Sequence, residues 1–186
     1  MTACLVDKNS HNRDRDKLKV FSQQCSSSLT LFFKVPEEGL YVFGGKDGQG
    51  KVLNTIKIFN MDAKSPQWRY PTVKGVPPTP RYNHSTLFYA PLGLLVVYGG
   101  KNDHLYGSTN NICLNDIRIF NLEHFAWAST SSHGDTSRVG RCLHAVAAHG
   151  SKMLIFGGVE FCQYANDEVV TIELSKHSLS FYKGFF

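Results

Sequence analysis

Short apolar runs alternate with turn-forming residues along most of the chain. Between residues 81 and 127 four such runs follow one another: an alternating run, an apolar run that ends on Gly99-Gly100, a run over 114–120, and a short run that carries Trp127. Gly, Asn, Pro and Ser occupy the connections. Four short strands separated by turn residues predict one small antiparallel sheet. A single sheet of this kind has two faces to bury, so it needs copies of itself.

The same pattern occurs before and after this segment. Five features recur in one order at intervals of roughly 55 to 61 residues: an apolar run, its closing glycine pair, a Leu-Asn segment, a tryptophan and an Arg-x-x-His element. A period near 50 residues indicates propeller blades. The recurring positions are Gly44-Gly45, Gly99-Gly100 and Gly157-Gly158, the segments 53–60 and 114–121, Trp68 and Trp127, and the pairs Arg81 with His84 and Arg141 with His144.

These features resemble the kelch repeat family, in which a strand ends in Gly-Gly, the third strand bears Phe or Tyr and the fourth bears Trp. The resemblance covers about residues 29–183. It implies an all-β fold, a kelch-type β-propeller that is incomplete here, with about three four-stranded blades. Their approximate ranges are 29–71, 81–129 and 141–183. Residues 1–28 are polar and charge-mixed, and we expect them to form a disordered tail.

The two ends of the repeat are irregular. The first blade should open with a strand over 29–33, but the Arg-x-x-His element that should precede it is missing from 23–29. In the third blade, the third strand is predicted over 166–172, and Ser180-Phe181-Tyr182 replaces the tryptophan of the fourth strand. Known propellers have four to eight blades. The chain is therefore a fragment, a unit that associates with copies or missing blades to complete a ring, or a short and marginally stable product.

Charge and cysteine content restrict the setting. The formal net charge is +5, and the 20 basic and 15 acidic residues are interspersed without a run of five like charges, which argues against nucleic acid as a partner. No run approaches the ~20 apolar residues that a membrane span needs. The five cysteines are odd in number and widely spaced. We expect a cytoplasmic or nuclear protein without membrane or nucleic-acid partners.

Most of the recurring residues are predicted to be structural. The glycine pairs open no helix, so they are not phosphate-binding loops, and we expect them to permit close backbone approach. Trp68 and Trp127 are predicted to be core residues between neighbouring blades. Arg81 and Arg141 are predicted to lie inside and to donate to backbone carbonyls of the adjacent blade; an anion site is the alternative.

Histidine and cysteine residues suggest one candidate metal site. Cys142, His144 and His149 lie close in sequence, with His133 nearby. However, His84 occupies the position equivalent to His144 without a matching cysteine, and no second ligand pair completes a zinc site. The ligand sets of kelch-like copper oxidases and nitrile-forming specifier proteins have no match. We therefore expect no metal, no cofactor, no catalytic residues and no enzymatic activity.

The resemblance implies a protein–protein interaction module, an adaptor or scaffold that binds another protein through propeller loops. The alternative is a regulatory or substrate-binding part of a larger enzyme, such as a kelch-containing phosphatase or oxidase. The loops predicted to bind are 46–51, 101–111 and 160–165. Their candidate contact residues are Lys101, His104, Tyr106, Phe161 and Tyr164.

Overall fold

The computed structural model describes residues 2–6, 39–60, 64–104, 113–128, 140–160, 164–165, 167–174 and 179–184. Within these residues the chain forms strands and one 3-10 turn, η1 (Ala90–Leu92), but no α-helix. The strands are β1 (Thr2–Val6), β2 (Gly39–Lys46), β3 (Val52–Asn60), β4 (Gln67–Arg69), β5 (Ser85–Tyr89), β6 (Leu94–Tyr98), β7 (Ile117–Asn121), β8 (Ala126–Trp127), β9 (Arg141–Cys142), β10 (Ala145–His149), β11 (Lys152–Phe156), β12 (Val159–Glu160), β13 (Tyr164–Ala165), β14 (Val169–Leu174) and β15 (Leu179–Gly184).

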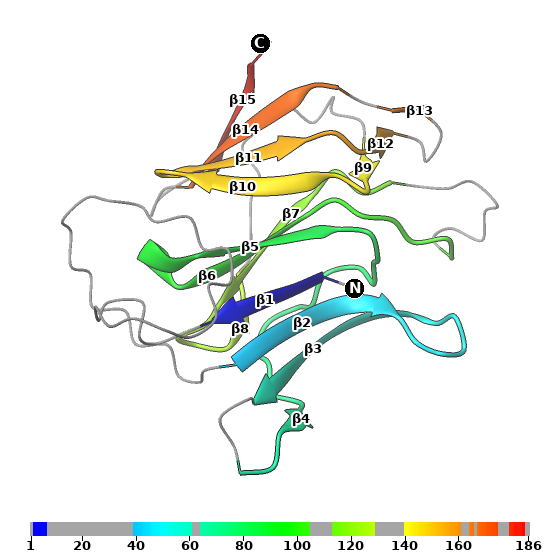
Figure 1. Ribbon diagram of the computed structural model, residues 1–186, viewed down its shortest axis with the longest axis vertical. Helices are drawn as coiled ribbons and strands as arrows, with labels where there is room; N and C mark the ends of the chain where they lie inside the picture. Colours follow the sequence, from blue (N-terminus) through cyan, green and yellow to red (C-terminus); the bar gives the residue numbers. More distant parts are fainter. Residues whose placement is uncertain are drawn as a thin grey trace.

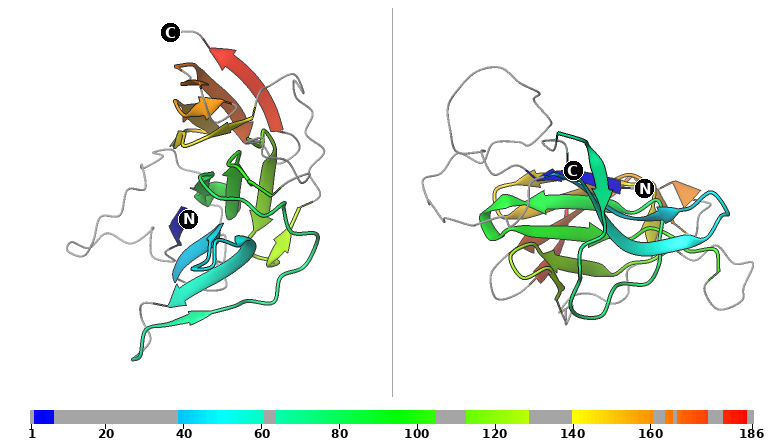
Figure 2. Two further views of the ribbon diagram at one scale, coloured as in Figure 1. Left: turned by 90° about the vertical axis from the view of Figure 1, so that its right-hand side faces the viewer. Right: turned by 90° about the horizontal axis from the view of Figure 1, so that it is seen from below.

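The strands make three four-stranded antiparallel sheets in chain order (Figure 1). We call them blade one (β1-β2-β3-β4), blade two (β5-β6-β7-β8) and blade three (β10-β11-β14-β15). A small sheet, β13-β12-β9, adjoins blade three. Figure 1 and the left-hand view of Figure 2 show the three blades following one another along the long axis, and strand β5 contacts β1 on one side and β10 on the other. This arrangement confirms the predicted all-β fold and the incomplete kelch-type propeller.

The first strand of blade one is formed by residues near the N-terminus and not by the predicted segment 29–33. Residues Thr2–Val6 pair along the edge of β2, with Thr2 opposite Phe43 and Val6 opposite Gly39. The prediction of a disordered tail is therefore wrong for these five residues. A five-residue run buries little area by itself, but the edge of β2 supplies backbone hydrogen-bond partners along its whole length. The strand predicted over 29–33 lies outside the described residues.

The third strand of blade two begins later than its hydrophobic pattern predicts. The predicted run started at Leu114, whereas β7 begins at Ile117. Leu114 instead binds two other segments, because its N–H donates to Gly100 O and its carbonyl accepts from the N–H of Arg141. Its neighbour Asp116 accepts from the guanidinium of Arg81. Of these contacts, the bond from Arg141 joins blades two and three, and the other contacts fix the start of blade two, so 114–116 do not extend the β-ladder.

Two apolar cores lie between the blades. Because strand side chains alternate between the two faces of a sheet, blade two contributes to both cores. The core between blades one and two contains Tyr41, Phe43, Ile56, Ile58, Leu95, Val97, Phe120, Leu122 and Trp127. The core between blades two and three contains Tyr89, Val96, Tyr98, Ile117, Met153, Ile155, Val170, Ile172 and Leu174.

The two tryptophans of the repeat have different environments. Trp127 is 6% exposed and packs on Phe43 and Phe120, as predicted for a residue between blades. Trp68 has the equivalent place beside Phe59, at a ring-centroid distance of 5.0 Å, but it is 48% exposed. The prediction that both are core residues is wrong for Trp68. Trp127 packs on the blade before its own, so the equivalent face of blade one, which carries Trp68, is turned away from blade two, on the side where a preceding blade would lie.

Candidate functional site

The Arg-x-x-His elements join each blade to the blade before it. The carbonyl of Arg81 accepts a hydrogen bond from the N–H of Gly45 at 2.8 Å, and the carbonyl of Arg141 accepts from the N–H of Gly100 at 2.9 Å. Each element therefore lies on the glycine pair of the preceding blade. This contact explains the spacing found in the sequence, and it occurs between blades one and two and again between blades two and three.

The arginine side chains donate hydrogen bonds within their own blade. Arg81 is fully buried, and its guanidinium donates to Gly99 O and to both carboxylate oxygens of Asp116, at 2.7 and 2.9 Å. Arg141 donates in the same way to Gly157 O and Glu168 O. All these acceptors belong to the arginine's own blade, so the predicted donation to the adjacent blade is wrong. A bidentate carboxylate neutralises the Arg81 guanidinium, which removes the reason to expect an anion there.

The histidine rings cover the strand that precedes each glycine pair. His84 packs edge-on against Phe43 at a centroid distance of 5.3 Å, and His144 packs against Tyr98 at 5.1 Å. Burial, assisted by the adjacent arginine charge, lowers the pKa of His84 to about 3 and that of His144 to about 4. Both rings are therefore neutral at physiological pH and act as packing groups.

The cysteine that suggested zinc has a different neighbour. The Sγ atom of Cys142 lies 3.6 Å from the Sγ of Cys113 in blade two, and neither cysteine is part of a disulfide. Leu143, between Cys142 and His144, has a left-handed backbone (φ 58°), which ends strand β9 before the histidine. His149 is exposed at the β10–β11 turn, and His133 lies outside the described residues. Across the described ranges, no group of three His, Cys, Asp or Glu residues could hold a metal ion.

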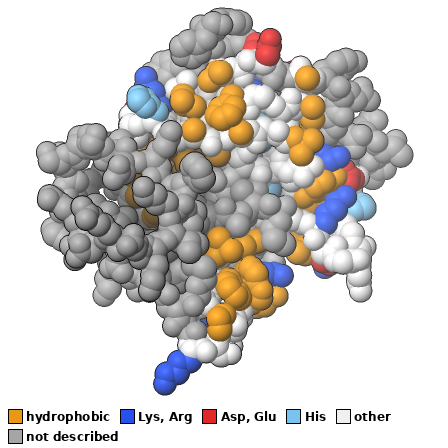
Figure 3. Space-filling model, in the orientation of Figure 1, with side chains coloured by type: hydrophobic (Ala, Val, Ile, Leu, Met, Phe, Trp, Pro, Cys, Tyr) orange, Lys and Arg blue, Asp and Glu red, His pale blue; other side chains and the backbone are white. Residues whose placement is uncertain are grey.

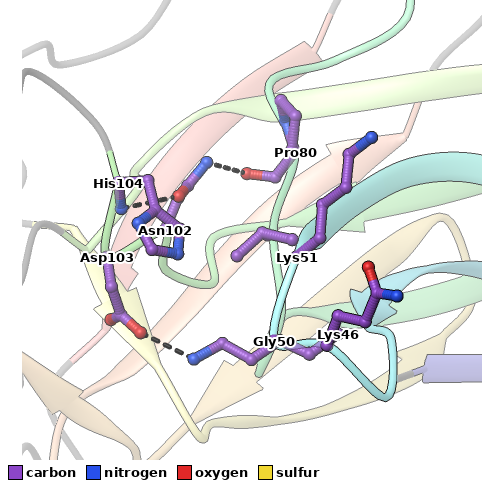
Figure 4. Close-up of a pocket in the computed structure, with 9 residues that line it drawn as sticks. Lys46, Gly50, Lys51, Pro80, Asn102, Asp103 and His104 are labelled. Atoms are coloured by element: carbon purple, nitrogen blue, oxygen red, sulfur yellow. Dashed lines mark hydrogen bonds and ion pairs between the residues drawn. The ribbon is translucent and has the colours of Figure 1, made fainter.

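A cleft opens where the loop after β2 meets the loop after β6 (Figure 4). The two loops carry the first two predicted binding segments, 46–51 and 101–111. The cleft has a volume of about 730 Å³. Its lining residues are Lys46, Gln49, Gly50, Lys51, Val52, Pro80, Asn102, Asp103 and His104.

Local hydrogen bonds shape both walls. In the first loop, the Asp47 carboxylate accepts from the backbone N–H groups of Gln49 and Lys51, a turn that glycine-rich sequence favours. In the second loop, the Asn102 side chain donates to Pro80 O at 2.8 Å and accepts from the N–H of His104 at 2.9 Å. These contacts give each loop a defined shape.

Asp103 connects the two walls. Its carboxylate accepts from Lys46 Nζ of blade one at 2.7 Å and from the Tyr82 hydroxyl at 2.5 Å, and Lys101 Nζ lies 3.4 Å away. The Lys46 ammonium also lies 4.1 Å from the centre of the Tyr82 ring, a cation–π distance. The hydrogen bonds from Lys46 and then Tyr82 lower the pKa of Asp103 to about 2, and Asp103 in turn raises the pKa of Lys46.

The structure brings only part of the predicted contact set to this cleft. His104 lines the cleft, and Lys101 stands beside it through its contact with Asp103. Tyr106 and Phe161 lie outside the described residues. Tyr164 belongs to β13, where its backbone pairs with Glu160, while the position of its side chain is outside the description.

Sequence reasoning missed the residues that join the loops. Lys46 and Asp103 fell within predicted loops but were not selected, and Tyr82 lay outside those loops. Aromatic residues guided the choice of contacts, whereas the structure assembles a charged cluster. One signal was present in the sequence. A lysine directly follows each of the first two glycine pairs, with an aspartate one or two residues later, as Lys46-Asp47 and as Lys101-Asn102-Asp103.

Among the described residues, no helix is long and apolar enough to span a bilayer.

The KLHDC2/KLHL20/DRC7 Kelch-repeats domain family matches residues 14–182. The Rab9 effector protein with kelch motifs of Rattus norvegicus is 31% identical over 131 residues, which cover 69% of this chain and 32% of that protein. Acyl-CoA-binding domain-containing protein 5 of Arabidopsis thaliana is 30% identical over 145 residues, 77% of this chain and 20% of that protein. The chain therefore spans a fifth to a third of these relatives.

Solved structures agree on the fold. The structure of YjhT matches with a TM-score of 0.60 at 19% identity, covering 78% of this chain and 48% of that one. A chain in the cryo-EM structure of RAG in complex with one melted and one unmelted RSS matches with a TM-score of 0.64 at 14% identity, covering 80% and 47%. Because the family match extends over nearly the whole sequence and each blade contact repeats the same glycine–arginine arrangement, this chain belongs to the kelch-repeat family.

Proposed function

We propose that the chain is a protein-interaction module that binds its partner at the cleft between blades one and two. The observation that carries this proposal is the meeting of two loops from different blades around Asp103, which makes a concave surface from segments far apart in sequence. A rigid sheet scaffold with variable loops is the usual setting for recognition. The kelch relatives support a protein as the ligand, and the partner's identity is not implied.

The charges of the cleft favour an acidic segment of the partner. Lys46 and Lys51 line the cleft and Lys101 adjoins it, whereas Asp103 is the one carboxylate among the lining residues. Lys46 and Lys101 share this one carboxylate, so positive charge remains in excess on the surface. A partner carboxylate would add to this network and gain charge-assisted hydrogen bonds from lysine. Binding should therefore weaken as salt concentration rises.

Peptide display tests the proposal because it needs no candidate partner. Random peptides are selected on the immobilised chain, and their affinities are measured by fluorescence anisotropy for the wild type and a Lys46→Glu/Lys51→Glu variant. We expect the selected peptides to be rich in Asp and Glu and to bind the variant at least ten-fold more weakly. The matched control is Lys64→Glu/Lys74→Glu, which changes two exposed lysines outside the cleft.

Two results would refute the assignment. Selected peptides that bind the cleft variant and the control variant equally would remove the cleft from the interaction. Peptides that lose affinity only for a Tyr106→Ser/Phe161→Ser/Tyr164→Ser variant would show that the peptides bind the aromatic loop residues that the sequence predicts. Circular dichroism of each variant shows whether the sheets are retained.

A second candidate function is that of a regulatory or substrate-binding part of a larger enzyme. The coverage of the relatives favours it, since the matched region is 20% of the acyl-CoA-binding protein and 7% of the Rho GTPase-activating protein gacHH of Dictyostelium discoideum. An antibody against residues of blade two distinguishes the two. An endogenous product near 20.8 kDa favours the free module, and a much heavier product favours the larger protein.

A further inference from the structure

Two thiols meet where blade three packs on blade two. Cys142, in strand β9 beside blade three, is 1% exposed, and Cys113, which precedes β7 of blade two, is half-buried. Their Sγ atoms are 3.6 Å apart, and the Cys113 Sγ also lies 3.8 Å from the carbonyl oxygen of Val159. The two sulfur atoms are thus in van der Waals contact, and a short approach would bring them to the about 2.05 Å of a disulfide bond.

The backbone holds the two cysteines together through their sequence neighbours. The N–H of Arg141 donates to the carbonyl oxygen of Leu114 at 3.1 Å. Gly140 lies so close to blade two that a Cβ atom there would collide with the carbonyl group of Cys113. Because the two backbones already touch beside the thiols, a disulfide can close by rotation of the cysteine side chains, without separation or sliding of the blades.

The other junction between blades is built without thiols. Val52 and Cys113 each pair with the residue that follows the glycine pair of their blade, and so do Tyr82 and Cys142. At the junction of blades one and two, Val52 therefore takes the place of Cys113, and Tyr82 takes the place of Cys142. The blade contact itself does not require sulfur, and both departures from the repeat fall at one junction, where they face each other.

We propose that Cys113 and Cys142 form a reversible disulfide that links blades two and three when the surrounding thiol pool becomes oxidised. The oxidant is a low-molecular-weight disulfide such as oxidised glutathione. Cys113, the more exposed thiol, loses its proton and its sulfur attacks one sulfur of the small disulfide, which releases one small thiol. The Cys142 sulfur, after losing its proton, attacks the Cys113 sulfur of this mixed disulfide and releases the second small thiol. The protein thereby gives up two electrons and two protons, and the two small thiols carry them away.

The link restrains a junction whose opening would expose apolar surface. The core between blades two and three contains Tyr98, Met153 and Ile155, and Figure 3 shows hydrophobic side chains gathered at the surface over blade three. Opening of the junction would add the core to this exposed surface, and large exposed apolar patches favour aggregation. The disulfide would also close a loop of about 30 residues, which restricts the unfolded chain. The site is separate from the cleft between blades one and two.

Peptide mapping tests the pairing on the unaltered chain. The folded protein is incubated with mixtures of reduced and oxidised glutathione, its remaining thiols are alkylated, and it is digested with trypsin without reduction. Each of the five cysteines falls on its own peptide, with Cys113 on 102–118 and Cys142 on 142–152. We expect these two to form roughly ten-fold more of the linked product than any other pair, and dithiothreitol to separate them. The preference should be lost in urea, because Cys142 is nearer in sequence to Cys162 than to Cys113.

Thermal unfolding shows whether the bond fits the native packing. The midpoint of the oxidised chain should exceed that of the reduced chain by about 5 °C or more. Cys113→Val and Cys142→Ala should each abolish this difference, and the first of these places the residue of blade one at the equivalent position of blade two. Cys25→Ser is the matched control and should retain the difference.

Three results would overturn the proposal. The first is recovery of Cys113 only as a mixed disulfide with glutathione, which would show that Cys142 does not displace the small thiol. The second is a different cysteine pair as the main linked product of the folded chain. The third is an oxidised chain that unfolds at the same or a lower temperature than the reduced chain, which would show that the bond forms at the expense of the native packing.

Discussion

Blade two and the outer blades contain the same residues at the same places but differ in what covers them. Blade two has an apolar core on each face, with Trp127 in one and Tyr98 in the other. Blade one has the equivalent tryptophan, Trp68, on an exposed face, and blade three has Phe156 exposed at the place of Tyr98. Whether these equivalent residues are buried therefore depends on the presence of a neighbouring blade, and the blade's own sequence supplies only the complementary surface.

The contacts that differ between the blades are those between neighbouring sheets, and not those within a sheet. Within a blade, the β-ladders are complete in all three sheets. Between blades, the specific contacts are the arginine carbonyl, the histidine ring and the tryptophan, and the first two occur twice among the described residues. Substitutions at equivalent positions should therefore have unequal effects that depend on the presence of the next blade.

The largest difference is expected between the tryptophans. Trp127→Ala removes a buried side chain that contacts both Phe43 and Phe120, so the free energy of unfolding should fall by about 3–5 kcal/mol. Trp68→Ala removes a half-exposed ring and should cost about 1 kcal/mol. Urea denaturation followed by circular dichroism measures both. Equal losses would show that the outer face of blade one is covered in solution.

The fold was predictable because each blade is marked by short sequence motifs that recur along the chain. Gly-Gly after an apolar run, the Phe-bearing third strand and the Arg-x-x-His spacing each have a contact in the structure, and the blades occur where the period puts them. The pairing of Thr2–Val6 with β2 was not predictable from so short a run. The exposure of Trp68 was missed because a repeat shows which residues are equivalent, but not whether a neighbour is present.

The cleft was less predictable than the fold. Two of the three predicted loops, 46–51 and 101–111, contribute residues to the cleft, because their polar, glycine-rich sequence interrupts the strands, and His104 lines it. The third, 160–165, instead contains residues of β12 and β13. The central group, Asp103 with Lys46 and Tyr82, comes from three segments of two blades. Opposite charges at such separations in sequence carry no signal until the blades are packed together. A carboxylate also holds the buried Arg81, and this role of Asp116 could be recognised only from the fold.

Acid should weaken the contacts between blades more than the sheets themselves. The pKa values of His84 and His144 are lowered to about 3 and about 4, mainly by burial, so the unfolded chain binds more protons than the folded chain below about pH 6.5. The stabilisation is fully present above that pH and is lost as the pH falls toward 4. Between pH 7 and pH 5 we expect a loss of about 3 kcal/mol. Urea midpoints at several pH values measure it.

The histidines can be separated from the other titrating groups. A His84→Gln/His144→Gln variant should be less stable at pH 7 and should lose most of the pH dependence between pH 7 and pH 5. His149→Gln, at an exposed turn, should keep the wild-type dependence. A double variant with an unchanged slope would place the acid sensitivity elsewhere.

A smaller effect is expected from the glycine pairs of blades two and three, because only the pair of blade two is covered by the next blade among the described residues. Gly99→Ala and Gly157→Ala impose the same left-handed strain, about 1 kcal/mol, because φ is 62° at Gly99 and 69° at Gly157. Only Gly99→Ala also places a Cβ atom 2.4 Å from the carbonyl oxygen of Arg141. We expect Gly99→Ala to be less stable than Gly157→Ala by about 2 kcal/mol in urea denaturation. Equal stabilities would mean that the glycine pair of blade three is also covered in the isolated chain.

The smallest effect is expected at the polar contact between blades one and two. Asp103→Asn removes the charge that Lys46 and Lys101 share, but these groups are partly exposed, and surface pairs contribute about 0–1 kcal/mol. Thermal unfolding should therefore shift by only a few degrees. Salt should abolish the difference between variant and wild type, because screening acts on exposed charges. A loss comparable to that of Trp127→Ala would show that the loops, in addition to the apolar cores, hold the first two blades together.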